Sequence, residues 1–157
     1  MALLRTFRSL PATATRVQES TQAEINARIC RETEAGVAKA AADREGIERR
    51  LRELDKEWDI ERVLQTNFAV VNLLSLTLGA LAARPWVLVA GVAAAFMGQH
   101  ALQGWCPPVP VFRRLGFRTA SEIAQERFAL KALRGDFREA GSGDPRKALQ
   151  AAGTPAT

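Results

Sequence analysis

The sequence predicts an all-α membrane protein, a two-helix transmembrane hairpin flanked by amphipathic cytoplasmic helices. Two observations carry this prediction. Val63 to Ala83 and Pro85 to Phe112 contain no Asp, Glu, Lys or Arg, and Arg84 alone separates the two runs. The segments before and after them are densely charged, and their apolar residues recur at helical spacing.

The charge of the chain and its distribution decide between nucleic acid and membrane lipid as partners. The chain has 157 residues, enough for one modest domain, and a net charge of +5. Such a charge permits contact with nucleic acid or with anionic membranes. The basic residues crowd beside the apolar runs, and no basic groove is interleaved with stacking aromatics. We therefore expect membrane lipid as a partner and no nucleic acid.

The two cysteines, Cys30 and Cys106, lie far apart, and neither belongs to a Cys-x-x-Cys pair. This leaves a disulfide framework and a structural zinc site unsupported. We expect no metal and no cofactor.

The chain before the hairpin divides into two parts. Residues 1–20 are predicted to be a disordered arm, and residues 21–62 to form charged amphipathic helices. Thr21 followed by Glu24 is a capping-box pattern, which predicts a helix start. A break is expected near residues 43–46. After it, apolar residues recur at spacings of four, three and four, which places them on one helical face: Ile47, Leu51, Leu54 and Trp58.

The hairpin is predicted over residues 63–112, with membrane-spanning helices at about 63–83 and 85–104. A helix of about 20 residues spans about 30 Å, the thickness of a bilayer's hydrocarbon core. Pro85 suits the first turn of the second helix, and Gly104 with Pro107-Pro108 ends it. The alternative is a buried hairpin in a soluble bundle, which requires more amphipathic helix than the chain contains.

The distribution of Lys and Arg predicts the orientation. Residues 43–62 carry six and residues 113–132 carry five, whereas the turn carries Arg84. Positive charge stays on the cytoplasmic side, so both termini are expected inside and the turn outside. Trp86 then marks the outer interface, and Trp58 and Trp105 mark the inner one.

Small and polar residues predict how the two helices pack. In the first helix they fall within an arc of about 80°: Gln65, Asn72, Ser75, Gly79 and Ala83. In the second helix Gly91, Ala94, Ala95 and Gly98 share one face. Small residues allow close backbone approach in lipid, so these faces are predicted to meet each other or a second copy. Asn72 is expected to hydrogen-bond across the contact.

The cytoplasmic end of the hairpin is polar. Antiparallel pairing brings together Gln65, Asn67, Gln99, His100 and Gln103, and Cys106 follows directly. A thiol beside an imidazole is typical of a nucleophile and its base. Helical geometry, however, directs His100 away from the side of Cys106, and no acidic group is expected nearby to orient the ring. We predict no catalytic residue, with Cys106 as a candidate thiol.

The chain after the hairpin is predicted to form a basic juxtamembrane segment and an amphipathic helix over residues 113–137. Thr119 followed by Glu122 is a second capping box, and Ile123, Leu130 and Leu133 lie on one side. Residues 138–157 are rich in Gly, Ser, Ala, Pro and Thr, which predicts a disordered tail.

Gly104-Trp105-Cys106-Pro107 followed by Leu115-Gly116, after a charged approach and a short hairpin, resembles the YgaP-like transmembrane domain. This is a bacterial inner-membrane family largely of unknown function. The resemblance covers about residues 60–118, and residues 117–137 look like a stand-alone proteobacterial branch. It implies a dimerising hairpin with cytoplasmic termini. Some members are fused to a rhodanese sulfurtransferase, but this sequence has no such domain and no Cys-Arg loop, so that activity is not carried over.

The functional expectation is a non-enzymatic integral protein of the bacterial inner membrane. It acts through helix–helix association, as a homodimer or as an accessory subunit of a membrane complex. Two alternatives remain open. One is thiol or sulfur handling at the cytoplasmic face through Cys106. The other is a path for a small solute in an oligomer, lined by Asn72 and Gln99.

Overall fold

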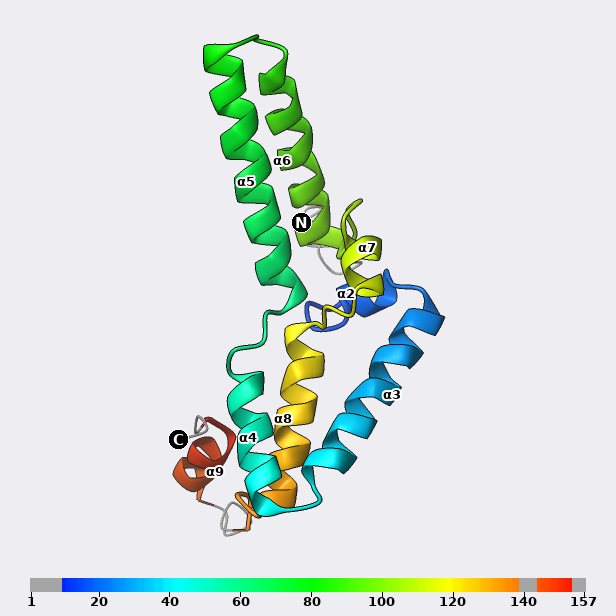
Figure 1. Ribbon diagram of the computed structural model, residues 1–157, viewed down its shortest axis with the longest axis vertical. Coiled ribbons are helices and arrows are strands. Elements are labelled where there is room, and N and C mark those ends of the chain that lie inside the picture. Colours follow the sequence, from blue (N-terminus) through cyan, green and yellow to red (C-terminus); the bar gives the residue numbers. More distant parts are fainter. Residues whose placement is uncertain (1–9, 139–143, 154–157) are drawn as a thin grey trace, which may run out of the picture. The chain divides into compact units, whose positions relative to one another are not determined.

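The computed structural model describes residues 10–138 and 144–153, and those residues contain helices and turns with no strand (Figure 1). The chain divides into two compact units. The first unit comprises residues 1–26 and 58–119, and the second comprises residues 27–57 and 120–157.

Two apolar helices dominate the first unit, α5 (Ile60–Leu81) and α6 (Trp86–Gln103). Both are long and apolar enough to cross a membrane, by length and composition. The α5 helix begins three residues before the predicted span, because the Asp59 carboxylate caps it by accepting from the Arg62 amide at 2.8 Å. The α6 helix ends at Gly104, which has a φ of 75°.

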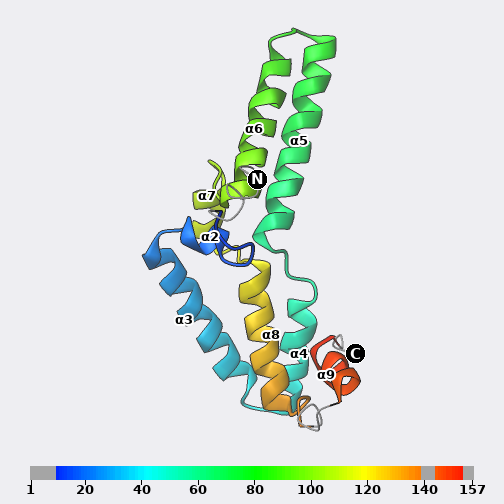
Figure 2. The ribbon, with the colours of Figure 1, turned by 180° about the vertical axis from the view of Figure 1, so that it is seen from behind.

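The α5 and α6 helices lie side by side (Figures 1 and 2). Near the connecting turn, a Cβ placed at Gly79 would stand 2.6 Å from Val87 Cγ2, so glycine permits the close approach there. The outward faces carry large apolar side chains that no described residue of the unit covers. Leu81 is 83% exposed and Leu88 is 72% exposed. In each helix the most apolar window is only 11% buried, whereas a core helix of a soluble protein is mostly buried.

A small apolar core lies at the other end of these helices. It involves α2 (Arg16–Glu19) and α7 (Val109–Arg114) and consists of Val17, Ile60, Leu64, Cys106 and Val109. Burial of Val17 explains why residues 16–19 are helical, although residues 1–20 were predicted to be a disordered arm. Residues 1–9 of that prediction lie outside the described residues.

The second unit has its own core. Helices α4 (Arg44–Leu54) and α8 (Ala120–Arg134) pack together with the end of α3 (Ala23–Ala40), whose first four residues belong to the first unit. The buried residues are Ala40, Ile47, Leu51, Leu54, Ile123 and Leu130. The predicted face of α4 is thus confirmed except at Trp58. That residue follows the end of α4, is 43% exposed and belongs to the first unit.

A buried ion pair joins α4 to α8. The Glu126 side chain is fully buried, and its two oxygens accept from Arg50 Nε at 2.7 Å and Arg50 Nη2 at 3.1 Å. A bidentate pair of this kind fixes the register of the two helices as well as their proximity.

The capping predictions have mixed outcomes. Thr21 does not cap α3, because its hydroxyl donates to the Val17 carbonyl and the helix starts at Ala23. The predicted break is present but lies at residues 41–43, earlier than the predicted 43–46, because Asp43 caps α4 and residues 44–46 are helical. The α8 helix begins directly after Thr119, as predicted.

The predicted disordered tail contains a helix, α9 (Pro145–Gly153). The buried Lys131 ammonium donates to the carbonyls of Ala151, at 3.2 Å, and Ala152, at 3.0 Å. A cation at the carboxyl end of a helix satisfies carbonyls that have no partner within the helix. Residues 139–143 and 154–157 of the predicted tail lie outside the described residues.

Candidate functional site

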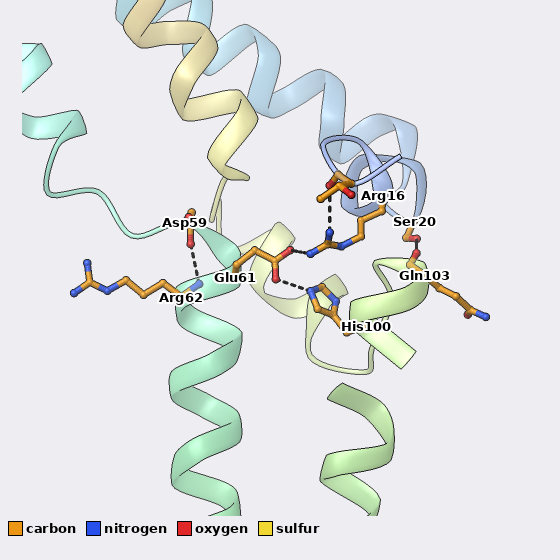
Figure 3. A network of polar contacts seen from close by, with 8 residues as sticks. Arg16, Ser20, Asp59, Glu61, Arg62, His100 and Gln103 are labelled. Carbon is orange, nitrogen blue, oxygen red and sulfur yellow. Dashed lines mark hydrogen bonds and ion pairs between the residues drawn. The ribbon is translucent and has the colours of Figure 1, made fainter. Parts of the chain in front are cut away.

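A polar network occupies the end of α5 and α6 opposite their connecting turn (Figure 3). Glu61 is the second residue of α5, and His100, the chain's single histidine, lies near the end of α6. His100 Nε2 is 2.9 Å from Glu61 Oε2, and Arg16 Nη2 donates to Glu61 Oε1 at 2.8 Å. One carboxylate therefore holds both a histidine and an arginine.

The His100 ring is nearly inaccessible, with 1% of the residue exposed. Its second nitrogen, Nδ1, is buried and makes no hydrogen bond. A buried polar atom without a partner is uncommon in folded proteins. The thiol of Cys106 is a neighbour of this nitrogen's ring and lies close enough to interact with it.

Gly104 brings Cys106 to this position. Its left-handed backbone reverses the chain after α6, and a Cβ there would stand 2.4 Å from the Arg16 carbonyl oxygen. Cys106 is 4% exposed and packs in the apolar core beside Leu64. The prediction that His100 points away from Cys106 is wrong, because it extended the helical geometry of α6 past Gly104.

The three side chains form a sequence of thiol, imidazole and carboxylate. A neutral imidazole that donates from Nε2 to Glu61 keeps Nδ1 as a proton acceptor beside the thiol. This is the order of groups found where a base activates a nucleophile and a third group orients the base. In its neutral form the ring can therefore accept the Cys106 proton.

An apolar cavity of about 230 Å³ reaches Cys106 from between α5 and α6. It is lined from α5 by Leu64, Asn67, Phe68 and Val71, from α6 by Val89, Val92, Ala93, Phe96 and Met97, and at one end by Cys106 and Pro108. We call this cavity the groove. Because Asn67 is the one amide side chain in its otherwise apolar lining, the groove suits a hydrocarbon ligand.

The predicted packing residues separate into two groups. In α5, Ser75 is buried and Gly79 meets Val87, so these two lie in the contact. Asn72 is half-buried, but its amide donates to the Phe68 carbonyl of its own helix at 3.0 Å and does not bond across the contact. Gln65 and Ala83 are exposed.

The α6 face differs from the prediction. Gly91, Ala94, Ala95 and Gly98 are all exposed, and a Cβ at Gly91 or Gly98 would meet nothing within 4 Å. The buried positions of α6 are Ala90 and His100. The small-residue face is therefore uncovered by the residues that the structure describes, and it does not meet the predicted face of α5.

Of the remaining motif residues, one adopts a backbone conformation that favours glycine and three have exposed side chains. Gly116 has a φ of 95°, which favours glycine. Pro107 is exposed, and Leu115 is 69% and Trp105 37% exposed. Gln99 and Gln103 approach each other at 3.5 Å on their own helix.

The site residues predicted from sequence patterns did not include Glu61 or Arg16. The predicted first span started at Val63 and so excluded Glu61, one turn before Gln65, although α5 starts at Ile60. The sequence did contain an indication of Glu61. This residue lies at the end of the hairpin opposite the turn, at the same level as the chain's single histidine. Arg16 carried no signal, because its arm was predicted to be disordered.

Within residues 10–138 and 144–153, no group of three or more His, Cys, Asp or Glu side chains could hold a metal ion. No protein-family model, no curated protein and no solved structure matches this chain.

Proposed function

We propose that this protein is an integral component of a bacterial inner membrane, with α5 and α6 as a transmembrane hairpin, that acts through helix–helix association. The associated form is a homodimer or a membrane complex in which the chain is an accessory subunit. The observation that carries the proposal is the uncovered surface of the two apolar helices, both their large side chains and the small-residue face of α6.

Insertion accounts for the exposed apolar side chains. Removing one large aliphatic side chain from water contributes about 2 kcal/mol, and Leu73, Leu74, Leu81 and Leu88 are each more than half exposed. At the start of α5 the Arg62 guanidinium lies 4.3 Å from the centroid of the Trp58 ring. A tryptophan and an arginine at a helix end are typical interfacial anchors. The distribution of Lys and Arg supports cytoplasmic termini.

Association follows from the small-residue face, which consists of Gly91, Ala94, Ala95 and Gly98. Two pairs four residues apart lie on it, Gly91 with Ala95 and Ala94 with Gly98. In lipid, small residues at this spacing allow two helices to pack closely and replace the hydrophobic drive that operates in water. Because α5 does not cover this face, it is available to a second helix.

Disulfide cross-linking in native membranes tests the association. In a Cys30→Ser, Cys106→Ser background, Gly98→Cys and Ala94→Cys should form a cross-linked dimer under mild oxidation. Val89→Cys is the control, because Val89 lines the groove between α5 and α6. Equal cross-linking at all three positions would contradict the proposed face, and no cross-linking at any of them would exclude the homodimer and leave the accessory subunit. Release of the protein by alkaline carbonate would contradict membrane insertion.

We also propose membership of the YgaP-like family. Supporting it, two glycines of the quoted motif, Gly104 and Gly116, adopt positive φ, so the motif has a conformational basis in this chain.

A second candidate function is thiol chemistry at Cys106, favoured by the arrangement of Glu61, His100 and Cys106. Its test is the rate of alkylation of Cys106 by a small membrane-permeant reagent, in the intact chain and in a His100→Asn variant. If His100 accepts the thiol proton, the variant should react several-fold more slowly near pH 7.

Cys30 is the internal reference for that test. It is exposed, and a hydrogen bond to Glu34 raises the pKa of its thiol. Its rate should be the same in both proteins. A Cys106 that reacts equally fast with and without His100 would exclude an activated thiol.

A further inference from the structure

The groove and the thiol form one continuous feature. The lining residues of α6 run from Val89 to Met97, which is about 12 Å along a helix at ~1.5 Å per residue. Cys106 lies at the end where the polar network begins. The apolar groove thus ends at the Cys106 thiol, which interacts with the buried ring of His100.

The dimensions indicate what fills the groove. One leaflet of the hydrocarbon core is about 15 Å thick, so the groove extends through most of one leaflet if α5 and α6 span the membrane. This step rests on the membrane insertion proposed above. Its lining is apolar apart from Asn67 and the thiol. A fatty acyl chain has the shape, polarity and depth that this lining requires, with its carboxyl end at the level of Cys106.

We propose that Cys106 carries a fatty acyl group as a thioester, with the chain lying in the groove between α5 and α6. The donor class is an acyl thioester of coenzyme A. This deepens the thiol function by naming its substrate class and assigning roles to His100 and Glu61.

The transfer is a thiol–thioester exchange. His100 Nδ1 takes the Cys106 proton, and the sulfur attacks the donor's carbonyl carbon. A carbon–sulfur bond to Cys106 forms, and the carbon–sulfur bond to coenzyme A breaks. The coenzyme A thiolate leaves and takes the proton from His100. Nothing is oxidised or reduced, and no water is consumed. Glu61 positions the ring by accepting from Nε2.

The chain contains a built-in comparison in Cys30. That thiol is exposed, borders no part of the groove and has Glu34 as its neighbour. A carboxylate there disfavours the thiolate, whereas an imidazole at Cys106 assists its formation. If these features govern acylation, Cys106 is acylated and Cys30 is not.

Intact-mass spectrometry of the protein extracted from membranes tests the proposal. The native chain and Cys30→Ser should gain the mass of one fatty acyl group, removable by neutral hydroxylamine. Cys106→Ser should lack it. In lipid vesicles, palmitoyl-coenzyme A should acylate the unmodified chain at Cys106. Glu61→Gln should slow this acylation several-fold. If Glu61→Asp restores the rate, the slowing results from lost positioning of the His100 ring and not from misfolding.

A groove-filling variant tests the location of the chain. Ala93→Phe occupies the groove and should lower acylation several-fold, whereas Val70→Phe, at an exposed α5 position outside the lining, should not. Equal acylation of both variants would overturn the groove as the site.

The failures are distinguishable. A protein that stays in carbonate-washed membranes with an unmodified Cys106, before and after palmitoyl-coenzyme A, overturns the thioester and leaves the membrane function standing. A phospholipid that co-purifies non-covalently while Cys106 stays free also overturns it. Release from the membrane by carbonate overturns both proposals.

Discussion

The two units each hold a largely buried carboxylate, and the two carboxylates are used differently. Glu126 in the second unit is fully buried and gives both oxygens to Arg50. Glu61 in the first unit is 29% exposed and gives one oxygen to Arg16 and the other to His100. The first arrangement pairs two charges of opposite sign. The second leaves His100 Nδ1 without a bond beside a thiol, which is an arrangement suited to proton transfer.

Removal of the Glu126 charge should have the largest effect on stability. The hydrogen bond that Arg50 donates to Glu126 holds the pKa of Arg50 above its usual range, and Glu126→Gln leaves that cation facing a neutral amide. We expect a loss of about 2 to 3 kcal/mol in the free energy of unfolding. This lies at or below the low end for buried pairs, because Arg50 retains Glu53 and Glu57. Chemical denaturation followed by circular dichroism measures it.

Two variants bracket that result. Glu53→Gln removes an exposed partner of Arg50 and should cost no more than about 0.5 kcal/mol. The double variant Arg50→Met, Glu126→Leu removes both charges and should recover most of the loss. A Glu126→Gln chain as stable as the Glu53→Gln chain would remove the distinction between the two carboxylates.

Glu61→Gln should separate stability from reactivity. The glutamine amide can still hydrogen-bond to His100, so we expect a loss of only about 1 kcal/mol in unfolding free energy. Alkylation of Cys106 should nevertheless slow several-fold, because the neutral amide stabilises a protonated ring less well. The two measurements belong on the same preparation. A stability loss as large as that of Glu126→Gln, with unchanged alkylation, would make Glu61 a structural group like Glu126.

Lys131 provides an intermediate case, a buried cation held by neutral carbonyls. Burial lowers the pKa of its ammonium group, so the unfolded chain binds its proton more tightly than the folded one. Stability should therefore rise as the pH increases from below the folded pKa towards the usual lysine pKa. Lys131→Met should abolish that rise and speed hydrogen exchange in α9 by roughly tenfold, with exposed Lys56→Met as the control.

A small effect is expected at Asp136. Arg134 Nε and Nη2 donate to its two oxygens at 2.8 and 2.6 Å, and these bonds lower the pKa of the Asp136 carboxyl. The stabilisation is complete above the unfolded pKa of about 4 and is lost as the pH falls through the lower folded value. Asp136→Asn should remove less than about 1 kcal/mol at neutral pH. Acid titration of unfolding should show no difference between the two proteins at the lowest pH.

The sequence predicted the elements that depend on local pattern. Charge-free runs of helical length located α5 and α6, and the apolar spacing of Ile47, Leu51 and Leu54 located the core face of α4. It failed where a single residue redirects the chain. Gly104 turns Cys106 back towards His100, and no helical wheel extended through Gly104 represents that reversal.

The second kind of failure concerns segments with little regular pattern. Residues 16–19 and α9 lie in segments whose composition predicts disorder, yet both are helical and contact residues far away in the sequence. Val17 is buried in the core of the first unit, and the carbonyls at the end of α9 bind Lys131. A local window does not contain the partner in either case. The same holds for Arg16 at the candidate site, whose partner Glu61 is 45 residues away.

The backbone hydrogen bond from the Ile60 amide to the Arg118 carbonyl, 2.8 Å long, has a wider consequence. The two ends of residues 60–118 therefore meet, and the segment is closed at its base. Insertions whose ends meet are tolerated within surface loops, because they do not separate the ends of the loop. The hairpin still depends on α2, because Val17 packs in its core and Arg16 binds Glu61, so a transferable unit comprises α2 together with residues 60–118.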